Sequence, residues 1–233
     1  MPSSETTSAS RAPVDRLPRG LQCALGVVIA AGLAMRLIYP ADTAFTEDQA
    51  YACALAQDIA NGHWQTGGLL NSGDFRNPPG FVYVLAAVWK VFPDPLALIR
   101  FIGFVNCLAV LAAWWLMRRW GGSAAAWWGT AFFAAAPWAI LYSRWLWAQH
   151  LLFPAALVVY FFLWRWVVLG KRWAALGVVL GLTLLVQIHL GAVVLALAIG
   201  LVLLWLRPRL PLIPLTIGVV LAIVSITGRT LNW

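Results

Sequence analysis

Long apolar runs divided by short basic breaks constrain the fold of this chain more than any other feature of its sequence. The chain has 233 residues, of which 62% are hydrophobic. Runs of this kind exclude an ordinary soluble domain. The weak alternation in short segments that marks a membrane β-barrel is not seen. The sequence therefore predicts an all-α, polytopic membrane protein.

About seven apolar segments are predicted to cross the membrane. They cover about residues 20–39, 96–117, 123–140, 151–166, 173–189, a sixth segment that ends at 206 and a seventh that ends near 227. A further apolar segment, 78–92, suits an interfacial or re-entrant helix better than a crossing, because a crossing needs about 20 residues. Gly177 and Gly181 lie four residues apart in the fifth segment and are expected to allow close helix packing.

The basic breaks predict the orientation of these segments. If 78–92 does not cross, every dense basic break falls on one side: Arg11, Arg16 and Arg19, then Arg118 and Arg119, then Arg165, Lys171 and Arg172, then Arg207 and Arg209. This positive-inside pattern predicts a cytoplasmic N-terminus and an outer loop at 40–95. Tryptophans beside the breaks at Arg118 and Lys171 are typical of an interfacial belt. The net charge of +8 therefore marks segment ends, and no nucleic-acid partner is expected.

Negative charge is concentrated in the outer loop, 40–95. This loop holds six of the eight acidic residues, and no Asp or Glu follows Asp94. Negative charge is costly in hydrocarbon, so it is retained where it faces water or a substrate. We therefore expect the chemistry of the protein to lie in this loop.

The segment 46–62 predicts a short amphipathic helix on the outer membrane surface, ended by Asn and Gly. Its apolar residues recur at helical spacing at Tyr51, Leu55 and Ile59. Thr46 can cap the helix, with Gln49 completing a capping box, and Glu47 and Asp48 in the first turn then favour the helix dipole. Alternatively, one carboxylate points into a cavity and takes a proton from an acceptor hydroxyl or amine.

Two further polar groups fall on the same predicted side. Arg144, Gln149 and His150 follow the third apolar segment, where the guanidinium suits a phosphate or carboxylate. An arginine that only anchors its helix at the headgroups is the alternative. Gln187 and His189 lie near the turn between the fifth and sixth segments, where they need a ligand or hydrogen bonds between helices.

Arg76 lies in the turn-rich stretch 74–80, which leads into the short helix at 78–92. A structural role explains this turn, and contact between Arg76 and a phosphate headgroup is the alternative. His63, His150 and His189 could all reach the outer face, but their spacing resembles no metal motif. No metal-binding residue is therefore assigned.

Four stretches carry a family resemblance. In chain order they read FTEDQAYACALAQDIANGHW, NPPGFVYVLAAVWKVFPDPLALIRF, AAAPWAILYSRWLWAQH and GLTLLVQIHLGAVVLAL. Together they resemble membrane glycosyltransferases of the GT-C fold, which include protein O-mannosyltransferase and aminoarabinose-transferase relatives. The resemblance covers roughly residues 20–206. It implies transfer of a sugar from a polyprenyl-phosphate donor to a lipid, glycan or protein acceptor, at the outer face of the inner or plasma membrane.

The resemblance also implies roles for individual residues. An acidic residue of the first outer loop acts as a base or orients the acceptor, and this role falls to Asp48 or Glu47. We favour Asp48, which precedes Gln-Ala and the helix of Tyr51 as in one branch of the family. Substrate contacts are expected from Tyr51, Arg76, Arg144, Gln149, His150, Gln187 and His189. A divalent metal is compatible with such a family, but no motif in this chain supports a metal or another cofactor.

The predicted organisation follows from these observations. Residues 1–19 form a disordered cytoplasmic tail, 20–227 form the transmembrane catalytic module, and 228–233 end a chain that we expect to be an N-terminal portion. A multi-pass transporter or lipid flippase is the main alternative, although it would place its polar groups near the bilayer midplane. A non-catalytic membrane scaffold is a second alternative, and it needs no cluster of outer acids.

Overall fold

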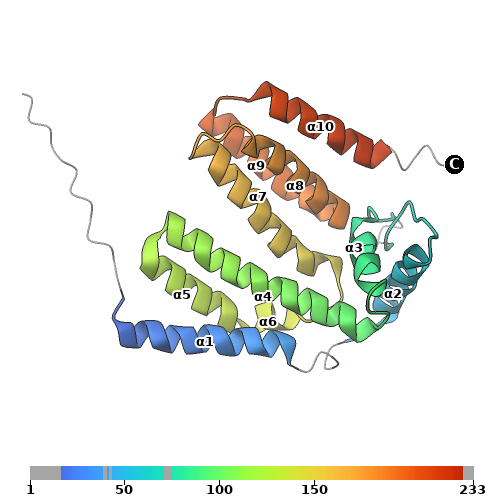
Figure 1. Ribbon diagram of the computed structural model, residues 1–233, viewed down its shortest axis with the longest axis horizontal. Coiled ribbons are helices and arrows are strands. Elements are labelled where there is room, and N and C mark those ends of the chain that lie inside the picture. The colour runs from blue at the N-terminus through green and yellow to red at the C-terminus, as the bar shows by residue number, and fades with distance from the viewer. Residues whose placement is uncertain (1–16, 39–40, 42–43, 71–74, 228–233) are drawn as a thin grey trace, which may run out of the picture.

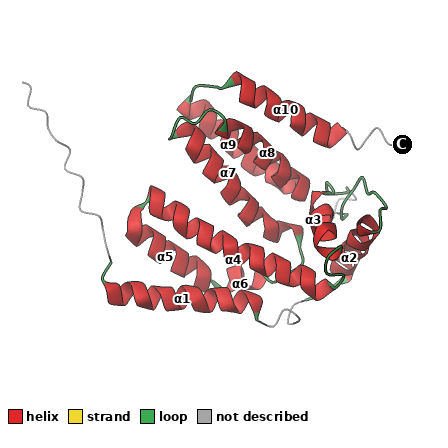
Figure 2. Ribbon diagram, viewed as in Figure 1, coloured by secondary structure: helices red, strands yellow, loops and turns green. Residues whose placement is uncertain are grey.

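The computed structural model describes residues 17–38, 41, 44–70 and 75–227. Most of the predicted tail, the acidic residues Asp42 and Asp74, and the segment 228–233 therefore lie outside the described residues. Within the described part of the chain every named element is a helix (Figure 2), and the only strand-like pairing is an isolated bridge between Leu70 and Arg76. The all-α prediction is confirmed.

The helices follow the predicted apolar segments closely. Their bounds are α1 Arg19–Leu37, α2 Glu47–Ala60, α3 Gly80–Trp89, α4 Pro95–Trp120, α5 Gly122–Ala135, α6 Pro137–Tyr142, α7 Leu152–Val167, α8 Ala174–Ile188, α9 Val193–Leu206 and α10 Leu212–Thr227, with short 3-10 turns η1 Ala148–Leu151 and η2 Leu190–Ala192. Three described helical segments are long and apolar enough to cross a membrane, judged by length and composition: Arg19–Leu37, Pro95–Trp120 and Ala148–Val167. The other apolar helices are shorter, at 10–17 residues.

Helix α9 exposes a continuous apolar stripe. Val194, Leu197, Leu201 and Leu204 recur at helical spacing, and each is 65–73% exposed. Soluble proteins rarely expose apolar patches of this extent, because water does not solvate them favourably. The stripe therefore suits contact with lipid.

The third apolar segment differs from the prediction of one span over 123–140. Helix α5 ends at Ala135, and α6 begins at Pro137. Proline has no backbone N–H, so it cannot continue the hydrogen bonding of α5 to the carbonyl of Phe133. The segment is therefore two helices with a break between them.

Arg36 of α1 stabilises this break. Its guanidinium donates hydrogen bonds to the carbonyls of Phe133 at 3.2 Å and Ala134 at 2.8 Å. Its side chain is 3% exposed, and a cation at a helix C-terminus is favoured by the helix dipole. Gly32 makes this approach possible, since a Cβ there would lie 2.2 Å from the oxygen of Ala134. Helix α1 is thus held closely against the end of α5.

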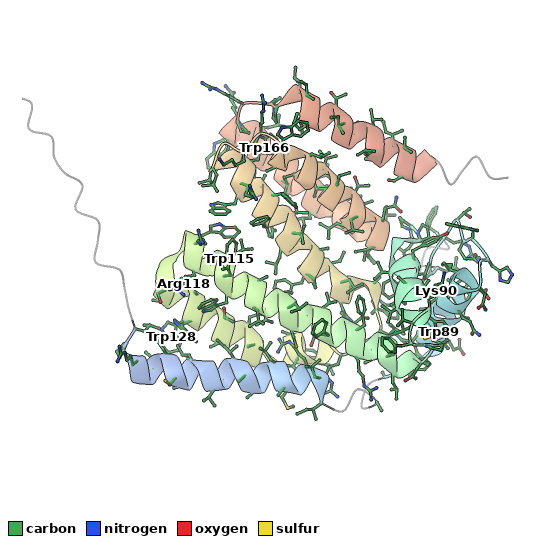
Figure 3. All side chains as sticks on the ribbon, in the orientation of Figure 1. Trp89, Lys90, Trp115, Arg118, Trp128 and Trp166 are labelled. Atoms are coloured by element: carbon green, nitrogen blue, oxygen red, sulfur yellow. The ribbon has the colours of Figure 1, made fainter. Side chains whose placement is uncertain are left out.

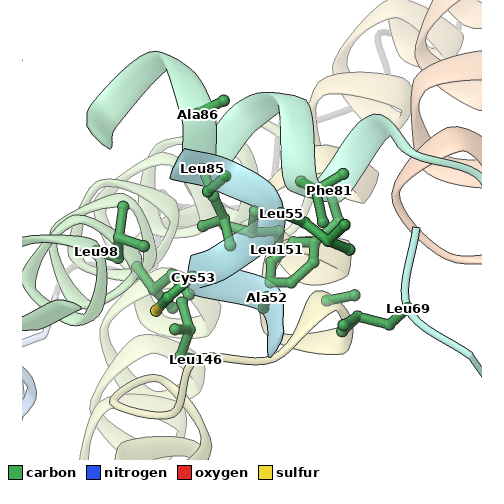
Figure 4. Close-up of a cluster of buried hydrophobic side chains, with 14 of the residues drawn as sticks. Ala52, Cys53, Leu55, Leu69, Phe81, Leu85, Ala86, Leu98, Leu146 and Leu151 are labelled. Carbon is green, nitrogen blue, oxygen red and sulfur yellow. The ribbon is translucent and has the colours of Figure 1, made fainter. Parts of the chain in front are cut away.

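The buried side chains of the described residues form three clusters, two of them within groups of helices that lie side by side in Figure 1. Helices α1, α4 and α5 share one cluster, and α7, α8 and α9 share another. The third joins α2 and α3 to the start of α4 and to residues 146–151, as Figure 4 shows. The loop helices α2 and α3 are therefore packed against the bundle by a core of their own. That core fixes the start of α2 relative to η1.

Close packing of α7 on α8 depends on small residues, as predicted. A Cβ at Gly177 would lie 2.5 Å from ring atoms of Phe162, and one at Gly181 would lie 2.7 Å from Val159. Overlap this severe is avoided because glycine has no side chain. The expectation for Gly177 and Gly181 is confirmed.

The two ends of the bundle differ in character (Figure 3). Trp89 and Lys90 mark the end where α2 and α3 lie, whereas Arg118 and Trp166 lie toward the opposite end. The tryptophans beside two basic breaks meet there, because the ring of Trp164 lies 6.3 Å from that of Trp115 and 6.5 Å from that of Trp120. The breaks after α4 and after α7 therefore share one end of the molecule.

Candidate functional site

The start of α2 organises the site. Helix α2 begins at Glu47 with Thr46 as its N-cap, and Gln49 Oε1 accepts the backbone N–H of Thr46 at 2.7 Å. The helix ends at Ala60, with Asn61 as its C-cap, and Gly62 follows at φ +95°. The predicted capping box and helix end are confirmed.

The buried face of α2 differs from the predicted stripe. Tyr51 is 39% exposed, whereas the buried apolar residues are Ala52, Cys53, Leu55 and Ala56. These small and aliphatic residues face α3 and the start of α4. Because α2 packs through this face, Asp48 and Tyr51, which lie one turn apart, are both exposed.

Asp48 lines a cavity of about 620 Å³, called here the Asp48 cavity. Its walls come from α2, from the loop between α2 and α3, from the turn at η1 and from the end of α8: Asp48, Leu69, Leu70, Asn77, Trp147, Ala148, Gln149 and His189. The loop wall is held by paired backbone, in which Gly68 N–H donates to Asn77 at 2.7 Å and Asn77 N–H donates to Leu69 at 2.8 Å. Three predicted site residues, Asp48, Gln149 and His189, thus share one cavity.

His189 and Gln149 are in direct contact across this cavity. His189 Nδ1 accepts the backbone N–H of Gly191 at 3.0 Å, so the neutral ring carries its proton on Nε2. That nitrogen lies 3.1 Å from Gln149 Nε2, so His189 donates to Gln149 when the amide is turned to present its oxygen to the ring. Partial burial lowers the pKa of His189 below its ordinary value, which keeps the ring neutral at pH 7. Among the described residues that line the Asp48 cavity, the carboxylate is therefore the only charged side chain.

A second cavity, called here the aromatic cavity, adjoins the first. Its volume is about 720 Å³, and it is lined by Thr46, Gln49, Asn106, Phe133, Ala139, Tyr142, Ser143, Trp145, Trp147, Gln149, His150 and Phe153. Trp147 and Gln149 line both cavities. Within the first turn of α2 and its cap, Asp48 lines the Asp48 cavity, whereas Thr46 and Gln49 line the aromatic cavity.

Stacked rings form one wall of the aromatic cavity. The ring of Trp145 lies 5.9 Å from Tyr142 at an interplanar angle of 26° and 6.1 Å from His150 at 15°. His150 Nδ1 bonds to the carbonyl of Trp145 at 2.7 Å, which places the proton of a neutral ring on Nδ1. Trp145 also donates its indole N–H to the carbonyl of Ala44 at 2.7 Å. This wall is therefore tied to the segment before α2.

Gln49 lines this cavity and carries a buried hydrogen-bond donor without a partner in the described part of the chain. Its side chain is 1% exposed, and its Oε1 is engaged by Thr46. Its Nε2 has no hydrogen-bond partner among the described residues. A buried donor without a partner costs about 1–3 kcal/mol. The folded protein therefore bears this cost at Gln49.

Asn106 is a site residue that the sequence reasoning missed. It lies within α4, is 7% exposed, and its Nδ2 donates to the carbonyls of Ile102 and His150, both at 3.0 Å. An asparagine inside a long apolar helix was the available signal, because a polar group in hydrocarbon needs a partner. Gln49 was likewise counted only as a capping residue.

The remaining predicted site residues lie elsewhere. Arg76 donates from Nη1 to the hydroxyl of Tyr51 at 3.1 Å, and both side chains are exposed beside the Asp48 cavity wall. Glu47, Arg144 and Gln187 line neither cavity. Arg144 and Gln187 are each 8% exposed, and the backbone of Gln187 packs against Gly80 at the start of α3.

Metal ligands are not gathered within the described residues. No group of three or more His, Cys, Asp or Glu side chains there could hold a metal ion.

Comparisons of the chain with protein-family models, with curated proteins and with solved structures found no match.

Proposed function

We propose that this chain is a membrane glycosyltransferase that moves a sugar from a polyprenyl-phosphate donor to an acceptor at the outer face of the membrane. The observation that carries the proposal is the shared cavity of Asp48, Gln149 and His189, which come from three separate parts of the chain. A carboxylate, two neutral polar groups and an adjoining aromatic cavity suit the transfer of an uncharged sugar. The family resemblance of the sequence supports the same reaction.

Asp48 acts in this mechanism as the general base. It takes the proton from the acceptor O–H or N–H, and the freed lone pair attacks the anomeric carbon of the sugar. The bond from that carbon to the phosphate oxygen breaks, and polyprenyl phosphate leaves with inversion at the anomeric centre. Asp48 is preferred to Glu47 because Glu47 lines neither cavity.

Arg76 supplies positive charge for the departing phosphate. Its guanidinium is held at 3.1 Å by the hydroxyl of Tyr51, one helical turn from Asp48. A guanidinium pairs well with phosphate oxygens, and charge placed near a developing anion lowers the barrier. Tyr51 therefore positions Arg76 beside the Asp48 cavity.

The aromatic cavity receives the sugar ring in this proposal. The described residues of its lining include no Asp, Glu, Lys or Arg, so an uncharged ligand is preferred. Flat aromatic rings such as those of Tyr142 and Trp145 pack against the apolar face of a sugar. His150 contributes its ring to the same wall.

The proposed membrane arrangement has about seven crossings, with a cytoplasmic N-terminus. Both cavities then lie at the outer end of the bundle, with α2 and α3 at the interface and the basic breaks inside. The candidate residues gather at one end, whereas a transporter would place its site near the midplane. This arrangement suits a donor whose lipid tail lies in hydrocarbon and whose sugar phosphate lies at the surface.

The two adjacent carboxylates provide the test. We expect Asp48→Asn to lower transfer at least about 100-fold, the loss typical for a general base. Glu47→Gln, which removes the same charge from the same helical turn, should stay close to wild type. The assay follows label from decaprenyl-phosphate mannose and decaprenyl-phosphate arabinose in membranes that contain the full chain, with membrane content of each variant measured by immunoblot. Wild-type turnover by Asp48→Asn, or no transfer by the wild type from either donor, would contradict the proposal.

A further inference from the structure

A third cavity lies at the connection between α7 and α8 and is rich in positive charge. It has a volume of about 540 Å³ and is lined by Phe162, Arg165, Gly170, Lys171, Arg172, Trp173 and Ala174. We call it the basic cavity. It shares no lining residue with the Asp48 cavity or the aromatic cavity.

Backbone hydrogen bonds fix the turn that carries the three cations. Lys171 N–H donates to the carbonyl of Arg165 at 2.9 Å, and Ala174 N–H donates to the carbonyl of Lys171 at 2.9 Å. Gly170 adopts φ +64°, a left-handed conformation that glycine tolerates without strain. The guanidinium of Arg165 is also held against the ring of Phe161, 5.6 Å from its centroid. The cluster is therefore a built feature of the turn.

The described residues offer no negative charge near this cluster. No Asp or Glu follows Asp94 anywhere in the sequence. The acids of α2 lie at the opposite end of the bundle from Arg118 and Trp166, as the positions of α2 and Lys90 in Figure 3 indicate. Like charges held together repel one another unless an anion joins them. An anion bound in the basic cavity would therefore reduce the repulsion among its cations.

The aromatic residues of the cavity indicate where that anion comes from. Trp173 is 55% exposed at the start of α8, and tryptophan rings favour the headgroup level of a bilayer. Phe162 adds an apolar wall on α7. Basic pockets between membrane helices recognise phosphate-bearing lipid headgroups. We propose that the basic cavity binds the phosphate headgroup of an anionic membrane lipid, independently of the sugar-transfer function.

Lipid titration of the purified full chain tests this proposal. Native mass spectrometry would measure binding of dioleoyl-phosphatidylglycerol, with dioleoyl-phosphatidylcholine as the zwitterionic comparison of zero net charge. We expect the double variant Lys171→Gln/Arg172→Gln to bind the anionic lipid about thirtyfold more weakly, because each such cation contributes about 1 kcal/mol and 1.4 kcal/mol is tenfold. The charge-keeping double variant Lys171→Arg/Arg172→Lys should retain binding.

A matched control separates a defined site from diffuse attraction. Arg118→Gln/Arg119→Gln removes two cations from the same end of the bundle but outside the basic cavity, and should change binding less than about threefold. Equal losses in both glutamine pairs would overturn the proposal, as would equal binding of the two lipids by the wild type. Full displacement of the lipid by millimolar inorganic phosphate would overturn the lipid assignment in favour of free phosphate.

Discussion

Asp48 and Glu47 are neighbours in one helical turn, yet their surroundings differ. Asp48 lines a cavity with Gln149 and His189, whereas Glu47 lines neither cavity near α2. Both carboxylates also lie where the helix dipole favours negative charge, so the capping and functional interpretations of this turn are compatible. The choice between the two acids depends on the direction in which each side chain leaves the helix.

His189 predicts a pH dependence of stability. Its pKa is lowered in the folded protein by burial, so the unfolded chain binds its proton more tightly. The folded state is therefore destabilised as pH falls through roughly 6.5, the ordinary histidine pKa, toward the lowered folded value. Above roughly pH 6.5 both states are neutral at this position and no such loss occurs.

Thermal unfolding between pH 8 and pH 5 checks this expectation. The wild type should lose more thermal stability on acidification than His189→Gln, because glutamine keeps a polar group without a titrating ring. The other titrating groups are common to both proteins, so the difference between the two slopes reports on His189. Equal loss of thermal stability with falling pH in the two proteins would contradict a role of His189 in this pH dependence.

At the level of elements, the contact of α1 with α5 depends on two particular residues of α1. Arg36 caps the carbonyls that Pro137 leaves without helical partners, and Gly32 lets the helices approach. The break at Pro137 was hidden by a continuous apolar pattern, because hydropathy does not record the missing N–H of proline. Arg36 was hidden for a similar reason, since its partners are backbone carbonyls about a hundred residues away in sequence.

Two glycines of α1 provide a matched pair for this contact. Gly32→Ala would place its Cβ 2.2 Å from the oxygen of Ala134 and should destabilise the protein by about 1–3 kcal/mol. Gly26→Ala meets only Trp127 at 3.8 Å, so it should be neutral or stabilising by up to about 1 kcal/mol. Free energies of unfolding in a denaturant titration compare the two variants. Equal effects would mean that α1 and α5 pack less closely than described.

At the scale of the whole molecule, charge separates the two ends. The described acids lie in α2 and just before α4, whereas the breaks at Arg118 and Lys171 lie at the end where Trp164 meets Trp115. Positive charge is retained preferentially on the cytoplasmic side. The proposed topology therefore places the Asp48 cavity outside and the basic cavity inside.

Labelling with a membrane-impermeant maleimide tests this sidedness. In a variant whose native cysteines are replaced, His63→Cys should react in intact cells because it follows α2 in the outer loop. Lys171→Cys should react only after the membrane is permeabilised. Reaction of both positions in intact cells would refute the predicted number of crossings between them.

The helices of this protein are largely determined by its sequence. Apolar runs, the capping box at Thr46 and the stop at Asn61 act over a few residues, and local physics of this range can be read along the chain. The segregation of the acids into one loop is equally visible without a structure. The sequence does not determine which of the polar residues come together in one cavity.

Only the tertiary structure decided which of the predicted residues meet. It joined Asp48 to Gln149 and His189, turned Gln49 toward a second cavity, and placed Arg144 and Gln187 in buried positions away from both cavities. It also added Asn106 from the interior of α4. The physical reason is that these neighbours lie far apart in sequence. Their contact depends on how whole helices pack and rotate, which residue spacing within one segment does not specify.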